Sequence, residues 1–297
     1  MTILRSIADW KRNRVAGLSK VTARRMYLSA QTGPEQAWME TSFFARLQLR
    51  NGTFKTTGDR RLDDLNELVG SLLPRGRTLE ILDTAVSSGI TTLEWYEHLR
   101  SLGVQVHLSA GDLFCEAELL SWGRHFHVLA DDTGHVLQYE TAGLAWRPWT
   151  TAGDWIPLYA PAVRATALFF RLLKLLRRPA RRALRLFSPR LLAVAGIDLF
   201  EDDLFEEKPA FAQKFDVIRA ANILNIAYFS KEKLELAIIR LAARLKTGGL
   251  LIVNRTTQEG VNHGSVFRLG ADRKFSVAGR VGEGSEIEDL LLATPVS

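Results

Sequence analysis

The sequence predicts an α/β fold built on a mostly parallel sheet, and three observations support this prediction. The runs "TLEILDTA" (78–85) and "VQVHLSAGD" (104–112) are apolar strands joined by a helical segment, which makes a strand–helix–strand unit. Two further strand-type runs, "KFDVIRAANIL" and "LLIVNRT", lie on either side of a helical pattern at 231–246. The last runs, "SVFRLG" and "KFSVAGRVG", are typical of antiparallel strands at a sheet edge.

The composition is that of a globular protein with a sizeable core. The chain has 297 residues, of which 46% are hydrophobic and 24% are charged. A single cysteine, Cys115, excludes an internal disulfide and a cysteine-rich metal cluster, and no histidine pair has metal-ligand spacing, so no metal site is expected. We find neither a signal-peptide core nor eighteen consecutive apolar residues, and we therefore expect a cytoplasmic protein without a transmembrane helix.

The helices are predicted from apolar spacing and from residues that start or stop them. Residues 1–73 read as mostly helical, and the clearest helix, at 62–72, ends before Pro74 and Gly76. In the first strand–helix–strand unit, Thr91 and Glu94 form a capping box for a helix that runs to about Leu102. Ser230 is expected to cap the later helix, which the Gly248-Gly249 pair terminates. We also expect "LLAVAGID" (191–198) to form a strand and "EIEDLLLA" (286–293) an edge strand.

The regular order breaks after residue 125, which predicts an insertion in the sheet domain. "HFHVLADDTGHVLQYE" reads as a hairpin around Asp132 to Gly134, and a basic stretch follows it to Arg190. We therefore predict four segments, namely an N-terminal helical region at 1–73, the first half of the sheet domain at 74–125, the insertion at 126–190 and the second half at 191–297.

The stretch "ILDTAVSSGITTLEW" (81–95) has two interpretations. The cluster from Ala85 to Gly89 is close to the G-x-S-x-G elbow of a serine esterase, with Ser87 as nucleophile. However, residues 1–78 contain no HGG-like loop that would supply an oxyanion hole, so the esterase is only a remote alternative. The other interpretation is a cofactor loop before a helix N-terminus, with Asp112 at the end of the second strand to bind ribose hydroxyls. A dinucleotide is not favoured, because G-x-G-x-x-G is absent.

At these residues the sequence resembles the class I S-adenosylmethionine-dependent methyltransferases. "ILDTAVSSG" matches their first motif, apolar-apolar-acid-x-G-x-G-x-G, although small residues replace two of the three glycines. The resemblance implies a Rossmann-like sheet with helices on both faces, an antiparallel C-terminal hairpin and S-adenosylmethionine as cofactor. It assigns to the cofactor site the first-motif residues Asp83, Ala85, Ser87 and Gly89, the ribose-binding acid Asp112, and Asp198 near the adenine.

The second half of the chain extends the resemblance. "FDVIRAANILNIAYF" matches the family's fourth motif, and its residues are similar to those of the chemotaxis-receptor methyltransferase branch. "LKTGGLLIVNRT" matches the end of the family's helix, the Gly-Gly pair and the fifth strand. Asn222 either lines the methyl-transfer and cofactor site or turns the chain. His263, in "GVNHGS", is either a general base for a substrate hydroxyl or a surface loop residue. The resemblance covers Leu79 to Asp112 and Leu191 to the end, and leaves out the N-terminal helices and the insertion.

The basic stretch has two interpretations of its own. Nine Arg and Lys residues and no acid lie between Trp155 and Ile197, so the rest of the chain carries a net negative charge. On a helical wheel one side holds Arg164, Arg171, Lys174 and Arg178, and the other side holds Leu168, Phe169, Leu172, Leu173 and Leu176. Pro179 breaks this helix, and a second basic turn follows. The pattern suits either an interfacial membrane helix at 160–190 or a helix whose leucines pack on the sheet. A nucleic-acid partner is not favoured, because the aromatic residues lie with the leucines.

These observations predict an S-adenosylmethionine-dependent methyltransferase whose acceptor is a lipid, glycan or small molecule at the inner face of a membrane. Methyl transfer is a displacement at an activated sulfonium, so the protein needs mainly to align its reactants and exclude water. A protein or RNA methyltransferase stays open, and so does a non-catalytic S-adenosylmethionine-binding or interaction protein. The sequence determines neither the acceptor nor the oligomeric state.

Overall fold

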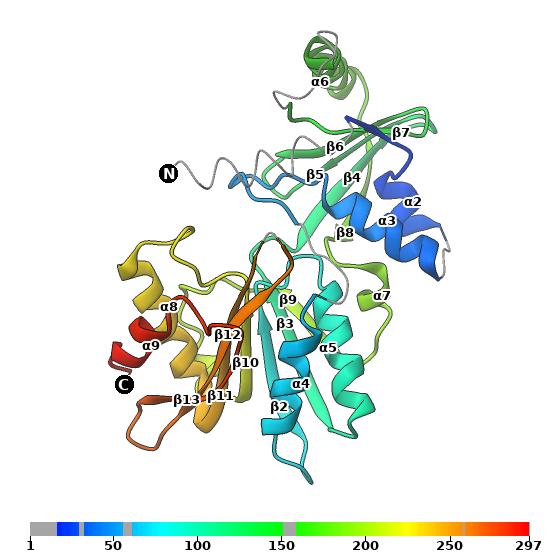
Figure 1. The fold of residues 1–297 in the computed structure, drawn as a ribbon. Coiled ribbons are helices and arrows are strands. Elements are labelled where there is room, and N and C mark those ends of the chain that lie inside the picture. The colour runs from blue at the N-terminus through cyan, green and yellow to red at the C-terminus, as the bar shows by residue number, and fades with distance from the viewer. Residues whose placement is uncertain (1–16, 30–32, 56–60, 151–158, 258, 297) are drawn as a thin grey trace. The chain divides into compact units, whose positions relative to one another are not determined.

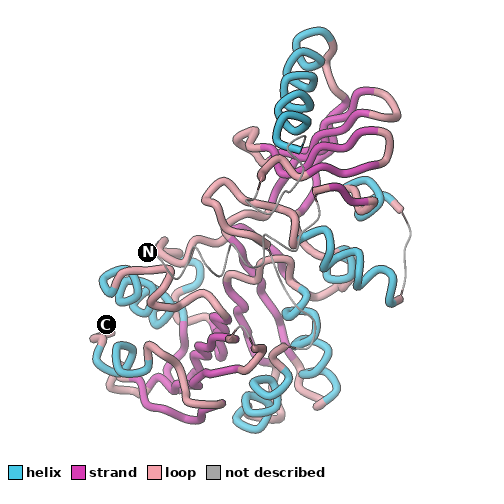
Figure 2. Tube along the Cα trace, turned by 45° about the horizontal axis from the view of Figure 1, so that its top comes forward, coloured by secondary structure: helices cyan, strands magenta, loops and turns pink. Residues whose placement is uncertain are grey.

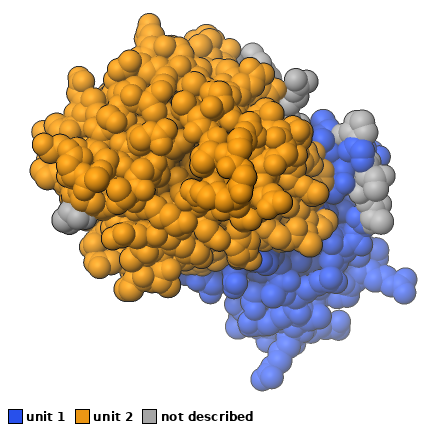
Figure 3. Space-filling view, turned by 90° about the horizontal axis from the view of Figure 1, so that it is seen from below, with its two compact units in different colours: residues 1–57, 114–189 blue, residues 58–113, 190–297 orange. Residues whose placement is uncertain are grey.

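The chain divides into two compact units, which Figure 3 colours separately. Unit 1 consists of residues 1–57 and 114–189, and unit 2 consists of residues 58–113 and 190–297. A computed structural model describes residues 17–29, 33–55, 61–150, 159–257 and 259–296. The first sixteen residues, which the sequence assigned to the N-terminal helical region, lie outside the described residues.

Unit 2 is built on a seven-stranded sheet. Its strands in chain order are β2 (Leu79–Thr84), β3 (Val106–Asp112), β9 (Ile197–Glu201), β10 (Phe215–Ala221), β11 (Leu245–Thr256), β12 (Asn262–Leu269) and β13 (Phe275–Val281). Their order across the sheet is β13-β12-β11-β10-β2-β3-β9, and the five strands from β11 to β9 pair in parallel. Counted in chain order, the parallel part reads 3-2-1-4-5, which is the order of a doubly wound Rossmann sheet.

Helices cover both faces of this sheet (Figure 1). They are α4 (Asp63–Leu72), α5 (Ile90–Ser101), α8 (Lys231–Arg244) and α9 (Glu288–Ala293), with a 3-10 turn, η1 (Pro209–Phe211), before β10. Apolar residues of α4 and α5 form one core cluster with the sheet, and those of α8 and α9 form another with its opposite face. The strands β12 and β13 form an antiparallel hairpin at the sheet edge. The predicted Rossmann-like α/β fold with a C-terminal hairpin is therefore confirmed.

Four local predictions in unit 2 are wrong. Gly248-Gly249 does not terminate α8, because the helix ends at Arg244 and the glycine pair lies inside β11. Residues 286–293 do not form an edge strand, because Glu288–Ala293 form the helix α9. Ile287 and Leu291 are one helical turn apart and are both buried on the same side of this helix. Thr91 does not cap α5, since Gly89 occupies the N-cap with a left-handed φ of 78°. The strand expected at 191–198 starts only at Ile197, after the short helix α7 (Pro189–Leu192).

Unit 1 contains a six-stranded antiparallel sheet with helices on both faces. Its strands are β1 (Leu18–Ser19), β4 (Glu116–Trp122), β5 (Phe126–Ala130), β6 (Val136–Thr141), β7 (Leu144–Trp146) and β8 (Ala180–Arg185), in the order β1-β7-β6-β5-β4-β8. The helices α2 (Ala23–Leu28) and α3 (Pro34–Phe44) pack on one face through Met26, Met39 and Phe43. The long helix α6 (Tyr159–Leu176) packs on the other face through Phe170, and Figure 2 shows it beside the strands.

The chain leaves the sheet of unit 2 after β3 and returns to it at β9, as the predicted insertion requires. The boundaries between the units, however, differ from the predicted segments. β4, placed by the sequence in the first half of the sheet domain, pairs with β5 and β8 instead. The N-terminal region is divided, since α2 and α3 belong to unit 1 and α4 to unit 2, and it also contains the strand β1.

The hairpin predicted around Asp132 to Gly134 joins β5 to β6. The second basic turn, by contrast, is the edge strand β8, where Arg181, Arg182 and Arg185 are all exposed. Charged side chains on an edge strand discourage pairing with another sheet.

Candidate functional site

The order of the strands in unit 2 reverses between β2 and β10. The chain steps away from β2 on one side to β3 and β9, and on the other side β10 leads to β11. In open parallel sheets ligands bind at such a reversal, outside the carboxyl ends of the strands. The carboxyl edge here is formed by the ends of β2, β3 and β10, at Thr84, Asp112 and Ala221.

The loop after β2 has an unusual backbone. Ala85, Ser87 and Gly89 have φ angles of 55°, 58° and 78°, so the three positions that the sequence matched to glycines all adopt the left-handed conformation. This conformation suits glycine and costs other residues about 1–3 kcal/mol. The loop is held to the sheet by the Val86 N–H, which donates to the carbonyl of Gly111 at 3.1 Å. The conformation of a glycine-rich loop is thus retained with small side chains.

Asp112 joins the end of β3 to this loop. Its side-chain Oδ2 accepts a hydrogen bond of 2.7 Å from the backbone N–H of Ser87, and the residue is 8% exposed. Three predicted site residues, Ala85, Ser87 and Asp112, are therefore brought together at the carboxyl edge. A carboxylate in this position can accept hydroxyl protons from a ribose, which is the role that the resemblance implies.

The elbow of an esterase is also a strained turn, so the φ of Ser87 does not by itself distinguish the two interpretations. The hydroxyl oxygen of Ser87 is buried. No hydrogen bond to Ser87 is formed by the described histidine rings that have hydrogen bonds. These rings bond to residues other than Ser87, and they belong to His107, His127, His135 and His263. The structure therefore gives no support to Ser87 as a nucleophile.

Asp83 is buried beneath the loop and does not face the carboxyl edge. Its carboxylate accepts from the guanidinium of Arg219 on β10, with Nε at 2.9 Å and Nη2 at 2.5 Å, and from the hydroxyl of Thr92 on α5 at 2.7 Å. Arg219 also stacks on Trp95 at 4.2 Å and donates to Asn66 on α4 at 3.4 Å. Asp83 thus ties β2 to β10 and to α5, and its place in the cofactor site stays a prediction.

Arg219 is a functional residue that the sequence analysis missed. A signal was present, because it is the only charged residue in the apolar run "VIRAA" within a central strand. A charge at such a position needs a buried partner. The partner is 136 residues away in the sequence, so local spacing does not reveal it.

Asn222 lies at the carboxyl end of β10 with a left-handed φ of 60°. Its side-chain oxygen accepts from the N–H of Thr256 at 2.7 Å, and its amide nitrogen donates to the hydroxyl of the same residue at 3.3 Å. Its own N–H donates to the carbonyl of Asn254. Of the two predicted roles, this geometry favours turning the chain and joining β10 to β11.

His263 lies at the start of β12 and is half-buried. Its Nδ1 accepts a hydrogen bond of 3.0 Å from the backbone N–H of Glu283, which places the proton of the neutral ring on Nε2. The lone pair of Nδ1 is then used by this hydrogen bond and Nε2 carries the proton, so the neutral ring has no free lone pair with which to act as a general base. The structural role is the one that this geometry supports.

Asp198 is placed apart from the other site residues. It is the second residue of β9, its side chain is 63% exposed, and its carboxylate lies 3.7 Å from the ring of His107. The acid that follows the carboxyl end of β9 is Asp202, which was not predicted. It is buried, its N–H donates to the carbonyl of Asp112, and its carboxylate pairs with Arg244 at 2.7 Å. Asp202 thus lies beside Asp112 at the carboxyl edge, whereas Asp198 does not.

Polar groups without partners also occur at this edge. Neither side-chain amide atom of Asn254, near the end of β11, has a hydrogen-bond partner among the described residues, and the residue is 2% exposed. The Ser88 hydroxyl in the loop is likewise buried without one. Asn254 faces Gly264 on β12, where a Cβ would lie 2.5 Å from that of Asn254, so the glycine makes room for this side chain. Buried polar groups of this kind are expected to meet a ligand or water.

The carboxyl edge also carries buried positive charge. Burial lowers the pKa of Arg61, the nearby charge of Arg219 lowers it further, and Glu94 and Tyr228 act in the opposite direction. Arg61 therefore lies within electrostatic range of β10, of α5 and of the loop after β10. Its Nε is buried without a partner in the described part of unit 2. A guanidinium in this setting suits an anionic ligand group such as a carboxylate.

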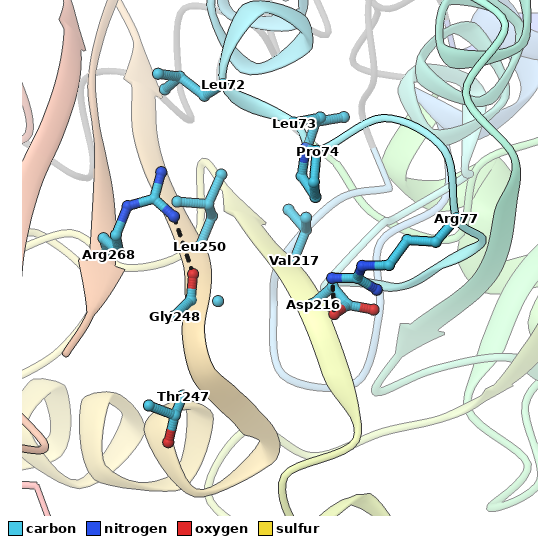
Figure 4. A pocket seen from close by; sticks show the side chains of 11 residues that line it. Leu72, Leu73, Pro74, Arg77, Asp216, Val217, Thr247, Gly248, Leu250 and Arg268 are labelled. Atoms are coloured by element: carbon cyan, nitrogen blue, oxygen red, sulfur yellow. Dashed lines mark hydrogen bonds and ion pairs between the residues drawn. The ribbon is translucent and has the colours of Figure 1, made fainter. Parts of the chain in front are cut away.

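A cavity of about 230 Å³ lies at the opposite, amino-terminal end of the sheet (Figure 4). Arg77 donates to Asp216 there at 2.7 Å, and Arg268 donates to the carbonyl of Gly248 at 3.0 Å. Burial raises the pKa of Asp216, but hydrogen bonds from Arg77, from the N–H of Glu80 and from Lys246 outweigh this and hold it below the ordinary value. This cavity contains none of the predicted site residues.

The described residues include no group of three or more His, Cys, Asp or Glu side chains that is arranged to hold a metal ion. None of the described helices combines the length and the apolar character that crossing a bilayer requires.

Comparisons with known proteins concern the fold. No protein-family model matches the chain, and neither does any curated protein. Similar solved structures include the CMeT domain of the citrinin polyketide synthase, which is 16% identical over 65% of this chain and 33% of that one, with a TM-score of 0.33. The cyclase SpnF is 15% identical over 65% and 44%, with a TM-score of 0.30. An S-adenosylmethionine-dependent methyltransferase from Mesorhizobium loti is 12% identical over 66% and 54%, with a TM-score of 0.31.

The chain thus spans about a third to about a half of the length of these solved chains. Their activities belong to those proteins, because one fold hosts many functions. The structure of the present chain shows a Rossmann-like α/β unit whose motif loop and second-strand acid meet at the carboxyl edge of the sheet.

Proposed function

We propose that the protein is an S-adenosylmethionine-dependent methyltransferase that acts on a lipid, a glycan or another small molecule. The observation that carries the proposal is the contact between Asp112 and the N–H of Ser87, at the carboxyl edge of a 3-2-1-4-5 sheet. This contact joins the loop with left-handed φ angles to an acid that could bind ribose hydroxyls, at the edge of the sheet where this fold binds ligands. Among the open classes, this arrangement favours a nucleoside-containing cofactor over a serine esterase.

The residues present fit such a cofactor. Asp112 would hold the ribose, and the loop from Ala85 to Gly89 allows the cofactor to approach the backbone. Arg61 is a cation suited to the carboxylate of the amino-acid part. When bound, S-adenosylmethionine supplies an activated methyl group. The protein then has to bind and orient the reactants and exclude water, which requires no catalytic triad.

The test is calorimetric titration of the full chain with S-adenosylmethionine and with S-adenosylhomocysteine. We expect both to bind, and Asp112→Asn to weaken the binding about tenfold, which corresponds to about 1.4 kcal/mol. This substitution keeps an acceptor for the Ser87 N–H but removes the charge that strengthens a hydrogen bond to a hydroxyl. Asp198→Asn is the matched control, because it removes an exposed acid of the same sheet that does not lie at the carboxyl edge. If neither compound binds at millimolar concentration, the proposal fails.

A non-catalytic S-adenosylmethionine-binding protein is the second candidate. The observation in its favour is that Asn222 and His263, the two predicted catalytic residues, both have side chains engaged with the backbone. Incubation with methyl-labelled S-adenosylmethionine and a fractionated cell extract separates the two candidates. Label in the lipid, glycan or small-molecule fraction supports the enzyme, and label in protein or RNA indicates the alternative acceptors. Binding of the cofactor without any labelled product favours the second candidate.

A further inference from the structure

The helix α6 is attached to unit 1 by one face only. Phe170 is buried against the sheet, where it stacks on Tyr139 with ring centroids 5.3 Å apart and contacts Trp122 at 5.7 Å. Leu173, predicted to lie with the other leucines, packs on this same cluster. The indole N–H of Trp122 donates to the carbonyl of Arg177 at 2.8 Å and holds the end of the helix in place. The orientation of α6 about its own axis is thereby fixed.

The opposite face of α6 is apolar and exposed. Successive residues of a helix are about 100° apart, which places residues 168, 172 and 175 on the side facing away from Phe170, with residues 169 and 176 beside them. Their exposed fractions are 58% for Leu168, 51% for Leu172, 82% for Leu175, 80% for Leu176 and 40% for Phe169. We call these five residues the leucine face. A contiguous exposed patch of this kind marks an interaction surface.

Basic side chains run along one border of the leucine face. They are exposed and lie at Arg164, Arg171, Lys174 and Arg178. In the described part of the chain none of these four forms an ion pair, and no acid occurs between residues 155 and 197. The border therefore presents uncompensated positive charge next to exposed leucines.

We propose that the leucine face and its basic border dock on an anionic lipid bilayer. The leucines would enter the boundary between headgroups and acyl chains, while the cations remain at the level of the headgroup phosphates. Charge complementarity favours this occupant over a second copy of the chain, since a symmetric pairing of two leucine faces would bring two basic borders together. A nucleic acid would satisfy the cations but would leave the leucines in water.

The proposal does not rest on methyl transfer, since it concerns a surface of unit 1 alone. If the cofactor does not bind, the lipid experiment keeps its meaning. If both proposals hold, the acceptor is expected to be delivered at a membrane surface. Anionic lipids are a property of the cytoplasmic leaflet, which is where we then expect the protein to act.

The test is flotation of the full chain with two kinds of vesicle, pure phosphatidylcholine and phosphatidylcholine with about one-third phosphatidylserine. We expect flotation only with the anionic vesicles. The triple variant Leu168→Ser, Leu172→Ser and Leu175→Ser is expected to lower the bound fraction at least tenfold. The variant Arg164→Gln, Arg171→Gln and Lys174→Gln is expected to lose the preference for anionic vesicles. All six positions are exposed, so the fold is preserved, and circular dichroism checks this.

The matched control lies on α8, where Lys231→Gln, Lys233→Gln and Leu236→Ser also remove two cations and one exposed leucine. It should float like the wild-type chain. The proposal is overturned if the wild-type chain ignores anionic vesicles, if the triple serine variant floats as well as the wild type, or if the α8 control loses as much binding. It is also overturned if size-exclusion chromatography shows a dimer that the triple serine variant dissociates, because the occupant is then a second copy.

Discussion

Two regions of the molecule, the centre of the sheet in unit 2 and the helix α6 in unit 1, depart from the usual distribution of residues in opposite ways. Unit 2 buries charge, since the side chains of Asp83 and Arg219 are 3% and 1% exposed, and those of Asp202 and Arg244 are 0% and 2% exposed. Unit 1 exposes apolar surface, since the leucine face on α6 includes side chains that are about four-fifths exposed. Buried charge and exposed apolar patches are the informative exceptions in a folded protein.

The difference between the two exceptions is whether the protein compensates for them. Asp83 and Asp202 each accept from a guanidinium and from a threonine hydroxyl, so the charge of these two acids is satisfied within the unit. Apart from Phe169, which contacts Phe126, the residues of the leucine face pack on no buried cluster in the described part of unit 1, so a partner for them has to come from outside. The buried ion pairs of unit 2 thus hold the strands of a candidate site together, and the leucine face marks a surface for a partner.

The largest effect is expected from Asp83→Asn. The substitution keeps the shape of the side chain but leaves the Arg219 guanidinium buried without a counter-charge, and breaking a buried pair in this way costs about 3–5 kcal/mol. Hydrogen exchange measured by mass spectrometry should show faster exchange in the peptides of β2 and β10, with a lower urea midpoint for unit 2. The exposed acid Asp198, changed to Asn, is the control and should leave both unchanged.

A double variant sharpens this prediction. Replacing Asp83 by Leu and Arg219 by Met removes both charges, and buried ion pairs replaced by apolar residues of similar size are often neutral in stability. The double variant should therefore recover most of the stability that Asp83→Asn loses. If it is as unstable as the single variant, the importance of Asp83 lies in its hydrogen bond to Thr92 and not in its charge.

A smaller effect is expected at Asp216, where the partners of the buried acid are themselves partly exposed. Arg77 is 51% and Lys246 is 39% exposed, so solvent screens the interaction. The pKa of Asp216 is lower in the folded chain, so its stabilisation is complete above the unfolded value of about 3.9 and disappears as the pH falls through the folded value. The difference in unfolding free energy between the wild type and Asp216→Asn should therefore be largest at neutral pH and shrink in acid. A difference that stays constant from pH 7 to pH 2 would contradict this account.

These two acids also show what the sequence can and cannot reveal. Apolar runs and helical spacing predict the parallel sheet and its interrupted order, because burial of strands and helix faces leaves a periodic pattern. Ala85, Ser87, Gly89 and Asp112 lie near one another, because a loop and the neighbouring strand end are fixed by the strand–helix–strand unit itself, and their contact with a cofactor stays a prediction. Asp83 matched the motif, but its pairing with Arg219 depends on contacts between β2 and β10 that no local pattern encodes.

The remaining errors have the same origin. Asp198 and Asp202 both lie near the end of an expected strand, and only the register of β9 against β3 shows which one follows it. The helical wheel of α6 grouped Leu173 with Leu168 and Leu172, because it gives relative directions and not the direction of the sheet. Leu175 was left out of this group, although the 100° spacing alone places it beside Leu168.

The loop offers a prediction of intermediate size. Ser87→Gly removes the strain of a left-handed serine, partly offset by the greater freedom of glycine in the unfolded chain, and should stabilise unit 2 by about 1 kcal/mol. The neighbouring Ser88 has no positive φ, so Ser88→Gly is the matched control and should destabilise by about 0.5–1 kcal/mol. Urea titration measures both. Cofactor binding should survive Ser87→Gly, whereas a nucleophilic Ser87 would make this variant inactive in an esterase assay.

The smallest effect is expected on α6 and completes the comparison between the units. Leu175 is 82% exposed, so Leu175→Ala removes little buried surface and should change the unfolding free energy of unit 1 by less than about 0.5 kcal/mol. Phe170, on the same helix and 4% exposed, is the contrasting position, where Phe170→Ala should cost about 3–5 kcal/mol. A large loss at Leu175 would show that the leucine face is already covered within the chain in solution, and the surface would then need no external partner. Equal stability of Leu175→Ala and wild type, together with weaker binding to anionic vesicles, would assign the exposed leucines to binding and not to folding.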